Sequence, residues 1–288
     1  MSLSQLYEAR RAMGSIAETM AGPARVVAIC NQKGGCGKTT TAINLAAGLS
    51  LRGDPTLIID LDPQGHATLG LGFEGEHLAH TIYDLFHDSQ ARLEDLALAT
   101  RVPLLSLVPA NALLAGAQLE LGTVLGREQV LQQAVTRLAP RFRHVLIDCS
   151  PSLNLLTINA LTAADFCLVP LQPHYYALEG MKELFTTIEL IKERFNPKLR
   201  FLGIVVVLVD SRMRITRELL AQIQGYFQGQ LMQSSIRMSP KLVEASIAGQ
   251  PAVLYAPGSS GAQDYSRLTE EVLARIEQSN GTADRPAG

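Results

Sequence analysis

The sequence predicts an α/β fold, in which helices flank a doubly wound and mostly parallel sheet. Short runs of unalternating apolar residues recur along the chain, as in parallel strands that helices cover on both faces. Stretches with helical spacing separate these runs, and a glycine-rich loop directly follows the first of them. Chains with this alternation bind their ligands at the carboxyl ends of the strands, so we expect the functional residues there.

Each apolar run marks one strand, and each stretch between the runs marks one helix. The expected strands are residues 26–31, 56–61, 104–109, 145–149, 166–171 and 201–209, with a short strand-like piece after residue 230. The expected helices are residues 39–51, 118–138, 153–162, 178–195, 215–227, 241–248 and 262–278.

The composition is that of a globular chain with an ample core. Of the 288 residues, 47% are apolar and 18% are charged, and the formal net charge is −2. A nucleic-acid site would therefore have to be a local basic patch. No uncharged apolar run reaches the roughly 18 residues of a membrane span, and Glu8, Arg10 and Arg11 interrupt any signal-peptide core. We expect a cytoplasmic protein without a membrane partner.

The chain divides into three parts. Residues 1–24 are an expected N-terminal helical extension, because apolar residues recur there at roughly helical spacing until Gly22 and Pro23 break the pattern. Residues 25–278 carry the strands and helices and are expected to form one domain. Residues 279–288 are mostly small and polar, and we expect a disordered tail.

A phosphate-binding loop follows the first expected strand. Residues 32–41 read Q-K-G-G-C-G-K-T-T-T, which matches the second half of the G-x-x-x-x-G-K-[ST] pattern and has Gln32 in place of the opening glycine. Lys38 is expected to reach the β- and γ-phosphates, and the Thr39 hydroxyl to bind Mg²⁺. Lys33 is one lysine more than such a loop needs. The residues expected to hold the nucleotide are Lys33, Gly34, Gly35, Cys36, Gly37, Lys38, Thr39 and Thr40.

Carboxylates stand at the ends of two further strands. Asp60 and Asp62 come at the end of the second expected strand, and strand alternation puts both on the same side. One of them is expected to be a magnesium partner and the other to orient the attacking water. Asp148 follows another apolar run, which is the pattern of a carboxylate that holds Mg²⁺.

With these motifs the sequence resembles the ParA/MinD family of P-loop ATPases with a deviant Walker A loop, and within it the ParA (Soj-like) DNA-partition proteins. The resemblance runs from about residue 25 to residue 277. The matching stretches are N-Q-K-G-G-C-G-K-T-T-T-A-I-N-L-A at residues 31–46, I-D-L-D-P-Q-G at residues 59–65, Y-Y-A-L-E-G at residues 175–180 and L-Y-A-P-G-S-S-G-A-Q-D-Y at residues 254–265.

The resemblance implies an ATPase that uses ATP and Mg²⁺. Lys33 matches the signature lysine, which reaches the partner subunit's phosphates in an ATP-bound homodimer, and Gly34 matches the glycine that lets two such loops approach. Asp62 matches the aspartate required for hydrolysis, and Asp148 matches the Walker B position. The resulting assignments are Lys33, Lys38 and Asp62 for catalysis, and Thr39, Asp60 and Asp148 for the metal site.

The resemblance also implies a DNA-binding switch. In this family the ATP-bound dimer binds DNA without sequence preference, and a ParB-type adaptor stimulates the slow hydrolysis that releases it. Arg212 and Lys241 match positions that contact DNA, and Arg214, Arg217 and Arg237 lie nearby and widen the predicted patch. The implied protein segregates plasmid or chromosomal DNA and associates with the nucleoid in the cytoplasm.

Three alternatives are weighed beside this interpretation. A close variant is an orphan relative that positions a protein cargo on the nucleoid, which sequence does not separate from DNA partition. A MinD-like membrane regulator needs a terminal helix with basic and bulky apolar residues, but Glu270, Glu271 and Glu277 dilute the last helix. An electron donor of the nitrogenase-reductase type needs cysteine motifs that the chain lacks.

Overall fold

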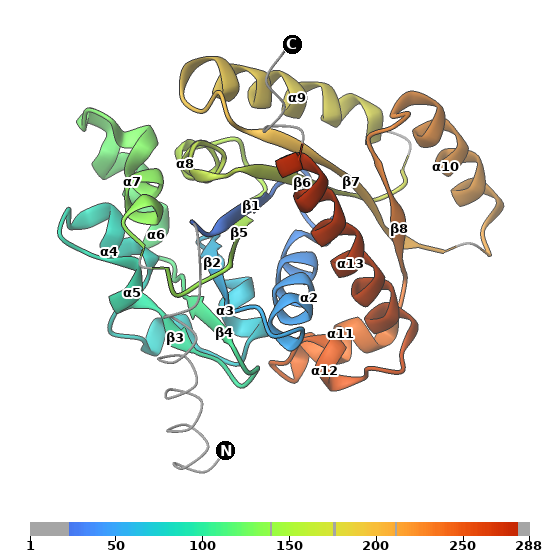
Figure 1. Cartoon of the computed structure of the whole chain (residues 1–288), viewed down its shortest axis with the longest axis horizontal. Coiled ribbons are helices and arrows are strands. Elements are labelled where there is room, and N and C mark those ends of the chain that lie inside the picture. Colours follow the sequence, from blue (N-terminus) through green and yellow to red (C-terminus); the bar gives the residue numbers. More distant parts are fainter. Residues whose placement is uncertain (1–22, 139, 175–176, 211, 282–288) are drawn as a thin grey trace.

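One eight-stranded sheet organises the part of the chain that the structure describes (Figure 1). This computed structural model describes residues 23–138, 140–174, 177–210 and 212–281. The strand order is β3-β4-β2-β5-β1-β6-β7-β8. Neighbouring strands are parallel, except that β3 pairs antiparallel with β4. The predicted doubly wound, mostly parallel fold is confirmed.

Strands and helices alternate along the chain. The strands are β1 (Arg25–Ile29), β2 (Thr56–Leu61), β3 (Leu98–Ala99), β4 (Leu105–Val108), β5 (His144–Cys149), β6 (Phe166–Leu171), β7 (Arg200–Val209) and β8 (Leu231–Arg237). The helices are α2 (Lys38–Leu51), α3 (His66–Gly70), α4 (Ile82–His87), α5 (Leu93–Leu96), α6 (Leu114–Glu120), α7 (Val130–Thr136), α8 (Leu155–Ala163), α9 (Ala177–Arg194), α10 (Arg214–Tyr226), α11 (Pro240–Ile247), α12 (Ala252–Tyr255) and α13 (Ser260–Gly281). Short 3₁₀ turns lie at Gly75–His77, Leu121–Thr123 and Arg127–Gln129.

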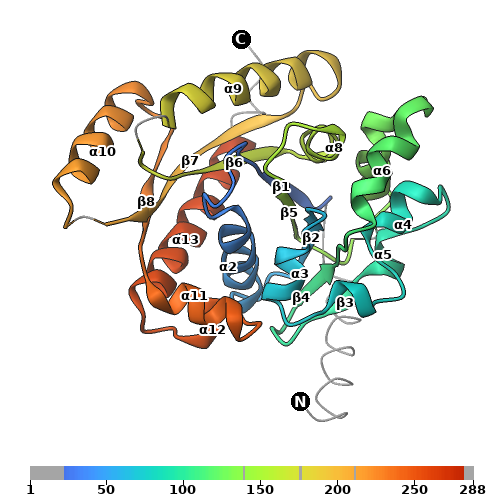
Figure 2. The ribbon, with the colours of Figure 1, turned by 180° about the vertical axis from the view of Figure 1, so that it is seen from behind.

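Two apolar layers cover the sheet, one on each face. Helices α4 to α10 bury apolar side chains against one face, and α2, α3, α11, α12 and α13 pack on the other (Figure 2). Residues of β2 alternate between the layers, with Leu57 and Ile59 in the first and Ile58 in the second. Because both faces are covered, the strands are continuous apolar runs, which is the pattern that the sequence shows.

The central strands place the functional residues. β1 lies between β5 and β6, and the chain crosses from one side of β1 to the other as it passes from β5 to β6. Open α/β sheets bind ligands at such a change of direction. Asp148 of β5 is in register with both Ile29 of β1 and Asp60 of β2. Two carboxylates therefore stand side by side where the strands end.

Two of the expected boundaries are wrong. The helix expected over residues 118–138 is broken, because α6 ends at Glu120 and α7 begins only at Val130. Between them Gly126 has a φ of 74°, a left-handed conformation that interrupts a regular helix. The tail expected from residue 279 begins too early, because α13 continues to Gly281. The pattern also predicts no element over residues 66–97, where the structure has α3, α4 and α5.

Some expectations fall outside the described residues. The expected extension over residues 1–24 is described only at Pro23 and Ala24, and the chain beyond Gly281 is not described. Tyr175 and Tyr176, which open the third family motif, are also outside the described residues.

The buried centre of β2 gives a first test of the fold. Leu57 is fully buried between the sheet and its helical layer, whereas Leu119 is 86% exposed. We expect Leu57→Ala to lower the free energy of unfolding by about 2–5 kcal/mol, because it leaves a cavity in a close-packed layer. Leu119→Ala is the control and should change it by less than about 0.5 kcal/mol. Urea unfolding measures both, and equal effects would contradict this assignment of the core.

Candidate functional site

The glycine loop between β1 and α2 is anchored at its base. Asn31 donates from Nδ2 to the Pro170 carbonyl oxygen at 2.7 Å, and its Oδ1 accepts the Lys33 N–H at 3.0 Å. Gly35 and Gly37 have φ angles of 69° and 77°, which glycine adopts without strain. The loop therefore turns directly into α2, whose first N–H groups lack partners within the helix and favour an anion.

A cavity of about 590 Å³ opens beside this loop. Predicted residues that line it are Gly34, Gly35, Gly37, Lys38, Thr39, Thr40 and Asp62. Lys38 is almost fully buried, and its Nζ donates to the Lys33 carbonyl oxygen at 3.0 Å. Cys36 is also buried, and it does not line the cavity. The structure thus brings six of the eight predicted nucleotide-binding residues together around one cavity, and the volume of this cavity suits a small-molecule ligand.

Lys33 lies differently from Lys38. Its side chain is not among those that line the cavity, and the residue is exposed. Its Nζ lies 3.4 Å from Oε1 of Gln172, in the loop after β6. One lysine of the motif therefore serves the cavity of its own chain, and the other extends over the surface beside it.

Asp148 is a buried carboxylate without a hydrogen-bond partner among the described residues. It is 0% exposed, and neither of its oxygens accepts a hydrogen bond. Burial raises the pKa of Asp148 well above its ordinary value, and nearby Asp60 raises it further, whereas Thr39 and Lys38 oppose the rise. A buried carboxylate beside a threonine hydroxyl is an all-oxygen donor set, which suits Mg²⁺.

Asp60 makes the contacts that Asp148 lacks. Its Oδ2 accepts hydrogen bonds from the N–H and the hydroxyl of Thr68, at 2.8 and 2.7 Å, and its Oδ1 accepts the Asp62 N–H at 3.2 Å. Burial raises the pKa of Asp60 to about 6, against the effect of these hydrogen bonds. Asp60 therefore ties the start of α3 to the end of β2. Asp60 lies beside Asp148 in the sheet, and its predicted role as a metal ligand stays a prediction.

Asp62 faces the cavity. It lies one residue beyond β2, is 7% exposed, and accepts the Gln64 N–H on Oδ1 at 3.0 Å. Its second oxygen is not used in that contact, so one carboxylate oxygen remains available beside the phosphate loop. This position is consistent with its predicted role toward an attacking water.

Several contributors to the site are not predicted by the sequence pattern. Thr68 clamps Asp60, and its hydroxyl also accepts the Ala110 N–H at 2.9 Å, which joins β2, α3 and the end of β4. Leu208 and Ile247 complete the apolar side of the cavity. The only signal for Thr68 is its place three residues after Gly65, and nothing local marks the two apolar residues, because they come from distant segments.

The predicted basic residues gather where β7 and β8 end. Arg212, Arg214 and Arg217 follow β7, whereas Arg237 ends β8 and Lys241 begins α11. The two segments are joined, because Val209 pairs with Arg237 and the Met238 N–H donates to the Val209 carbonyl oxygen at 3.0 Å. The five residues therefore share one edge of the sheet.

Most of these cations already pair with a carboxylate. Arg212 pairs with Asp210 at 2.7 Å, Arg214 with Glu218 at 2.8 Å, and Lys241 with Glu244 at 2.5 Å. The pairs of Arg214 and Lys241 are exposed, and exposed ion pairs contribute little. Arg212 is held more closely, because its Nε and Nη2 donate to the two oxygens of the half-buried Asp210, at 2.8 and 2.7 Å. Arg217 is exposed, and no ion pair within the described residues holds it.

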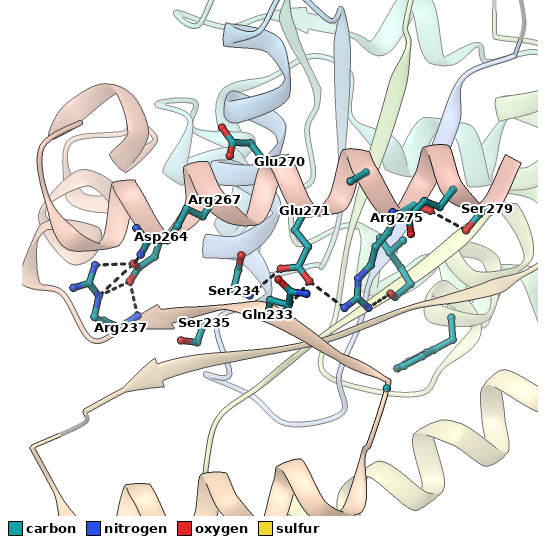
Figure 3. Close-up of a pocket in the computed structure, with 15 residues that line it drawn as sticks. Gln233, Ser234, Ser235, Arg237, Asp264, Arg267, Glu270, Glu271, Arg275 and Ser279 are labelled. Carbon is teal, nitrogen blue, oxygen red and sulfur yellow. Dashed lines mark hydrogen bonds and ion pairs between the residues drawn. The ribbon is translucent and has the colours of Figure 1, made fainter. Parts of the chain in front are cut away.

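Arg237 pairs with a fully buried carboxylate. Its Nε and Nη2 donate to the two oxygens of Asp264, at 2.9 and 2.8 Å, and its N–H donates to Oδ2 at 2.9 Å. Asp264 is fully buried and also contacts Arg267 (Figure 3). Arg237 thus fastens the end of β8 to α13, a role that the sequence pattern does not indicate.

A larger cavity lies between β8 and α13, away from the phosphate loop. Its volume is about 1070 Å³, and Arg237, Arg267 and Arg275 line it together with Asp264, Glu270 and Glu271 (Figure 3). Glu271 accepts the N–H groups of Gln233 and Ser234, at 2.7 and 2.8 Å. The positive and negative side chains neutralise each other and hold α13 against β8. The residues that line this cavity therefore have a structural role.

The arrangement defines a class of protein. A glycine loop, a buried lysine, a threonine and strand-end carboxylates meet at the carboxyl edge of a parallel sheet, which is the site of a P-loop nucleoside triphosphatase. A family model described as an AAA domain matches residues 24–201. The chain belongs to this family and, within it, to the ParA/MinD-like P-loop ATPases.

Relatives of this family match the chain over most of its length. The sporulation initiation inhibitor protein Soj of Bacillus subtilis is 40% identical over 87% of this chain and 98% of its own. The chromosome partitioning protein ParA of Myxococcus xanthus is 42% identical over 87% of this chain and 88% of its own. A crystal structure described as cobyrinic acid a,c-diamide synthase from Mycobacterium smegmatis, with a bound ATP analogue and magnesium, is 32% identical. It covers 88% of this chain and 96% of its own, with a TM-score of 0.78.

Within the described residues, no helix has both the length and the apolarity that crossing a bilayer requires.

The unpartnered carboxylate of Asp148 leads to a test of stability. A carboxyl whose pKa is raised by folding opposes folding once the pH exceeds its ordinary value, and the penalty disappears as the pH falls and the carboxyl is protonated. We therefore expect Asp148→Asn to stabilise the protein in EDTA at pH 8 by at least about 1 kcal/mol, and by less at pH 5.

Thermal unfolding at the two pH values measures this effect. Asp95→Asn, which changes an exposed carboxylate on α5, is the matched control and should leave the Tm unchanged at both. A Tm of Asp148→Asn that equals or falls below the wild-type value at pH 8 would show that the buried charge carries no such penalty.

Proposed function

We propose that this chain is a partition ATPase that dimerises on ATP, binds DNA without sequence preference and releases it when a ParB-type adaptor stimulates hydrolysis. The relatives that support this proposal match nearly the whole chain, and two of them are named for sporulation control and chromosome partitioning. The proposal places the protein in the cytoplasm, on the nucleoid, where it segregates chromosomal or plasmid DNA.

The observation that carries the proposal is the position of Lys33. A phosphate loop that only holds ATP needs Lys38, which lines the cavity. Lys33 is exposed and extends beside the cavity, against Gln172. A second copy of the chain that brings its own loop to this face would place phosphates within reach of this lysine. In this proposal, the contact between Lys33 and the phosphates of the second copy stabilises the ATP-bound dimer.

The residues of the site have separate roles in the proposed reaction. The Gly34, Gly35 and Gly37 loop and Lys38 bind the phosphates, and Thr39 with Asp148 would hold Mg²⁺. When bound, Mg²⁺ neutralises charge on the phosphate oxygens. Asp62 faces the cavity and orients the attacking water through its carboxylate. No general base stronger than a carboxylate is required, because phosphoryl transfer depends mainly on positioning and charge.

The basic edge at the ends of β7 and β8 is the proposed DNA surface. Arg212, Arg214, Arg217 and Lys241 are exposed there, and phosphate contacts need only such cations. A single chain presents few of them, and their carboxylate partners offset part of the charge. A dimer doubles the patch, which links DNA affinity to ATP.

DNA binding measured against salt with ATP, with ADP and without nucleotide tests the proposed function. We expect tight binding only with ATP, and a slope of log K against log salt that becomes shallower by about 1 for each phosphate contact removed, as in Arg212→Ala. Arg101→Ala, an exposed arginine in the turn between β3 and β4, is the control. Equal affinity in all three nucleotide states would refute the switch.

Lys33→Ala separates the two lysines of the loop. We expect nucleotide affinity to stay within about threefold of wild type, because Lys33 does not line the cavity, and hydrolysis to fall at least about tenfold, because a cation supplied in trans is lost. Nucleotide titration and phosphate release measure the two effects. Lys198→Ala, an exposed lysine just before β7, is the control. Wild-type turnover in Lys33→Ala would rule out a role across the interface.

A further inference from the structure

A buried polar contact joins the phosphate-loop helix to the last helix. The hydroxyl oxygens of Thr41, in the first turn of α2, and Tyr265, in α13, lie 3.1 Å apart. Both residues are almost fully buried, at 0% and 1% exposed. Burial raises the pKa of Tyr265, so the phenol stays protonated and keeps its hydrogen-bond donor. Thr41 lies two residues after Thr39, so this contact begins at the nucleotide site.

The residue beside Tyr265 holds the basic edge. Asp264 precedes it in α13, and its carboxylate binds the backbone N–H and the guanidinium of Arg237 at the end of β8. Successive residues of a helix point about 100° apart, so α13 directs one side chain at α2 and the next at β8. Asp264 and Tyr265 end the motif at residues 254–265, to which the nucleotide site assigns no task.

A second contact starts one residue earlier in α2. Asn44 donates from Nδ2 to the Thr40 carbonyl oxygen at 2.9 Å, and its Oδ1 accepts the Val253 N–H at 3.2 Å. Val253 is in the first turn of α12, which packs against α11, where Lys241 is located. The amide can satisfy both contacts in one orientation only. It thus ties the first turn of α2 to the helices beside the basic edge.

α2 and α13 approach each other closely at Gly48. Gly48 of α2 lies so close to Thr269 of α13 that a Cβ at Gly48 would come within 2.4 Å of the Thr269 hydroxyl. Closely packed helices pass a displacement to each other rather than absorb it. The two polar contacts also favour one relative position of the helices, because a hydrogen bond weakens steeply when its geometry changes.

We propose that Tyr265 and Asn44 are positioning residues, which couple the first turn of α2 to the Arg237 and Lys241 edge so that bound nucleotide sets the arrangement of that edge. This inference rests on the proposed function, because it concerns how ATP controls the DNA surface. Tyr265 acts through Asp264 on β8, and Asn44 acts through α12 on α11. Both residues are buried, and neither lines the cavity beside the phosphate loop.

Tyr265→Phe removes one hydroxyl and keeps the ring. We expect the ratio of DNA affinities measured with ATP and with ADP to fall at least about fivefold, the lower end of ordinary allosteric coupling, while the affinity for ATP is unchanged. Hydrogen–deuterium exchange of residues 231–237, with ATP and with ADP, follows the same coupling without DNA. The nucleotide-dependent difference in the wild type should be lost in Tyr265→Phe.

Two further variants separate coupling from packing. Thr269→Val removes another buried hydroxyl of α13 at the α2 interface, but that hydroxyl donates only to the Tyr265 carbonyl oxygen of its own helix, so coupling should be kept. The double variant Thr41→Val with Tyr265→Phe replaces both partners by apolar groups of similar shape, which restores stability and still loses coupling.

The contact of Asn44 is tested separately. Asn44→Leu should remove the nucleotide-dependent difference in hydrogen–deuterium exchange of residues 252–255.

The outcomes distinguish this inference from the proposed function. Wild-type protein that binds DNA equally with ATP and ADP would refute the proposed function, and the exchange measurement would still decide the coupling. If hydrogen–deuterium exchange of residues 231–237 in the wild type is the same with ATP and with ADP, the coupling is wrong and the proposed function is unaffected. A Tyr265→Phe protein with wild-type values, or a Thr269→Val protein that loses as much as Tyr265→Phe, would also overturn the coupling.

Discussion

The structure depends on the register of three central strands, which places two carboxylates side by side beneath a phosphate loop. Asp148 is in register with Asp60 on one side and with the last residue of β1 on the other. The loop that follows β1 therefore begins where negative charge is already concentrated. Two buried carboxylates repel one another, and the pKa of each is raised here. A cation bound between them and the loop would relieve this repulsion.

The two carboxylates have opposite surroundings, and this difference divides their work. Thr68 saturates one oxygen of Asp60 and fastens α3 and the end of β4 to the same point. Asp148 keeps both oxygens without partners within the described residues, although it is equally buried. A buried carboxylate with hydrogen-bond partners stabilises the local structure, whereas one without partners costs stability. The two aspartates thus share a register but differ in their surroundings, as the proposed metal role of Asp148 requires.

The basic edge follows a similar division. Arg237 has a bidentate contact with the fully buried Asp264, so its guanidinium is part of the joint between β8 and α13. Arg214 and Lys241 pair with carboxylates that are about half exposed, whereas Arg212 makes a bidentate contact with the half-buried Asp210. Because α13 contacts both β8 and α2, the joint at Asp264 and the contact at Tyr265 lie on one helix between the basic edge and the nucleotide loop. The phosphate loop and the proposed DNA surface are therefore connected through α13.

The sequence by itself determined the sheet, the loop and the strand-end carboxylates, because each depends on neighbours in the chain. Parallel strands covered on both faces are visible as apolar runs, and β2 and β6 have the expected bounds. Only the tertiary structure decided which aspartate has hydrogen-bond partners, which lysine lines the cavity and which arginine joins β8 to α13. Thr68 is eight residues from Asp60, Asp264 is 27 from Arg237, and Tyr265 is 224 from Thr41. Local pattern carries no record of such pairings, because folding, not sequence spacing, brings these side chains together.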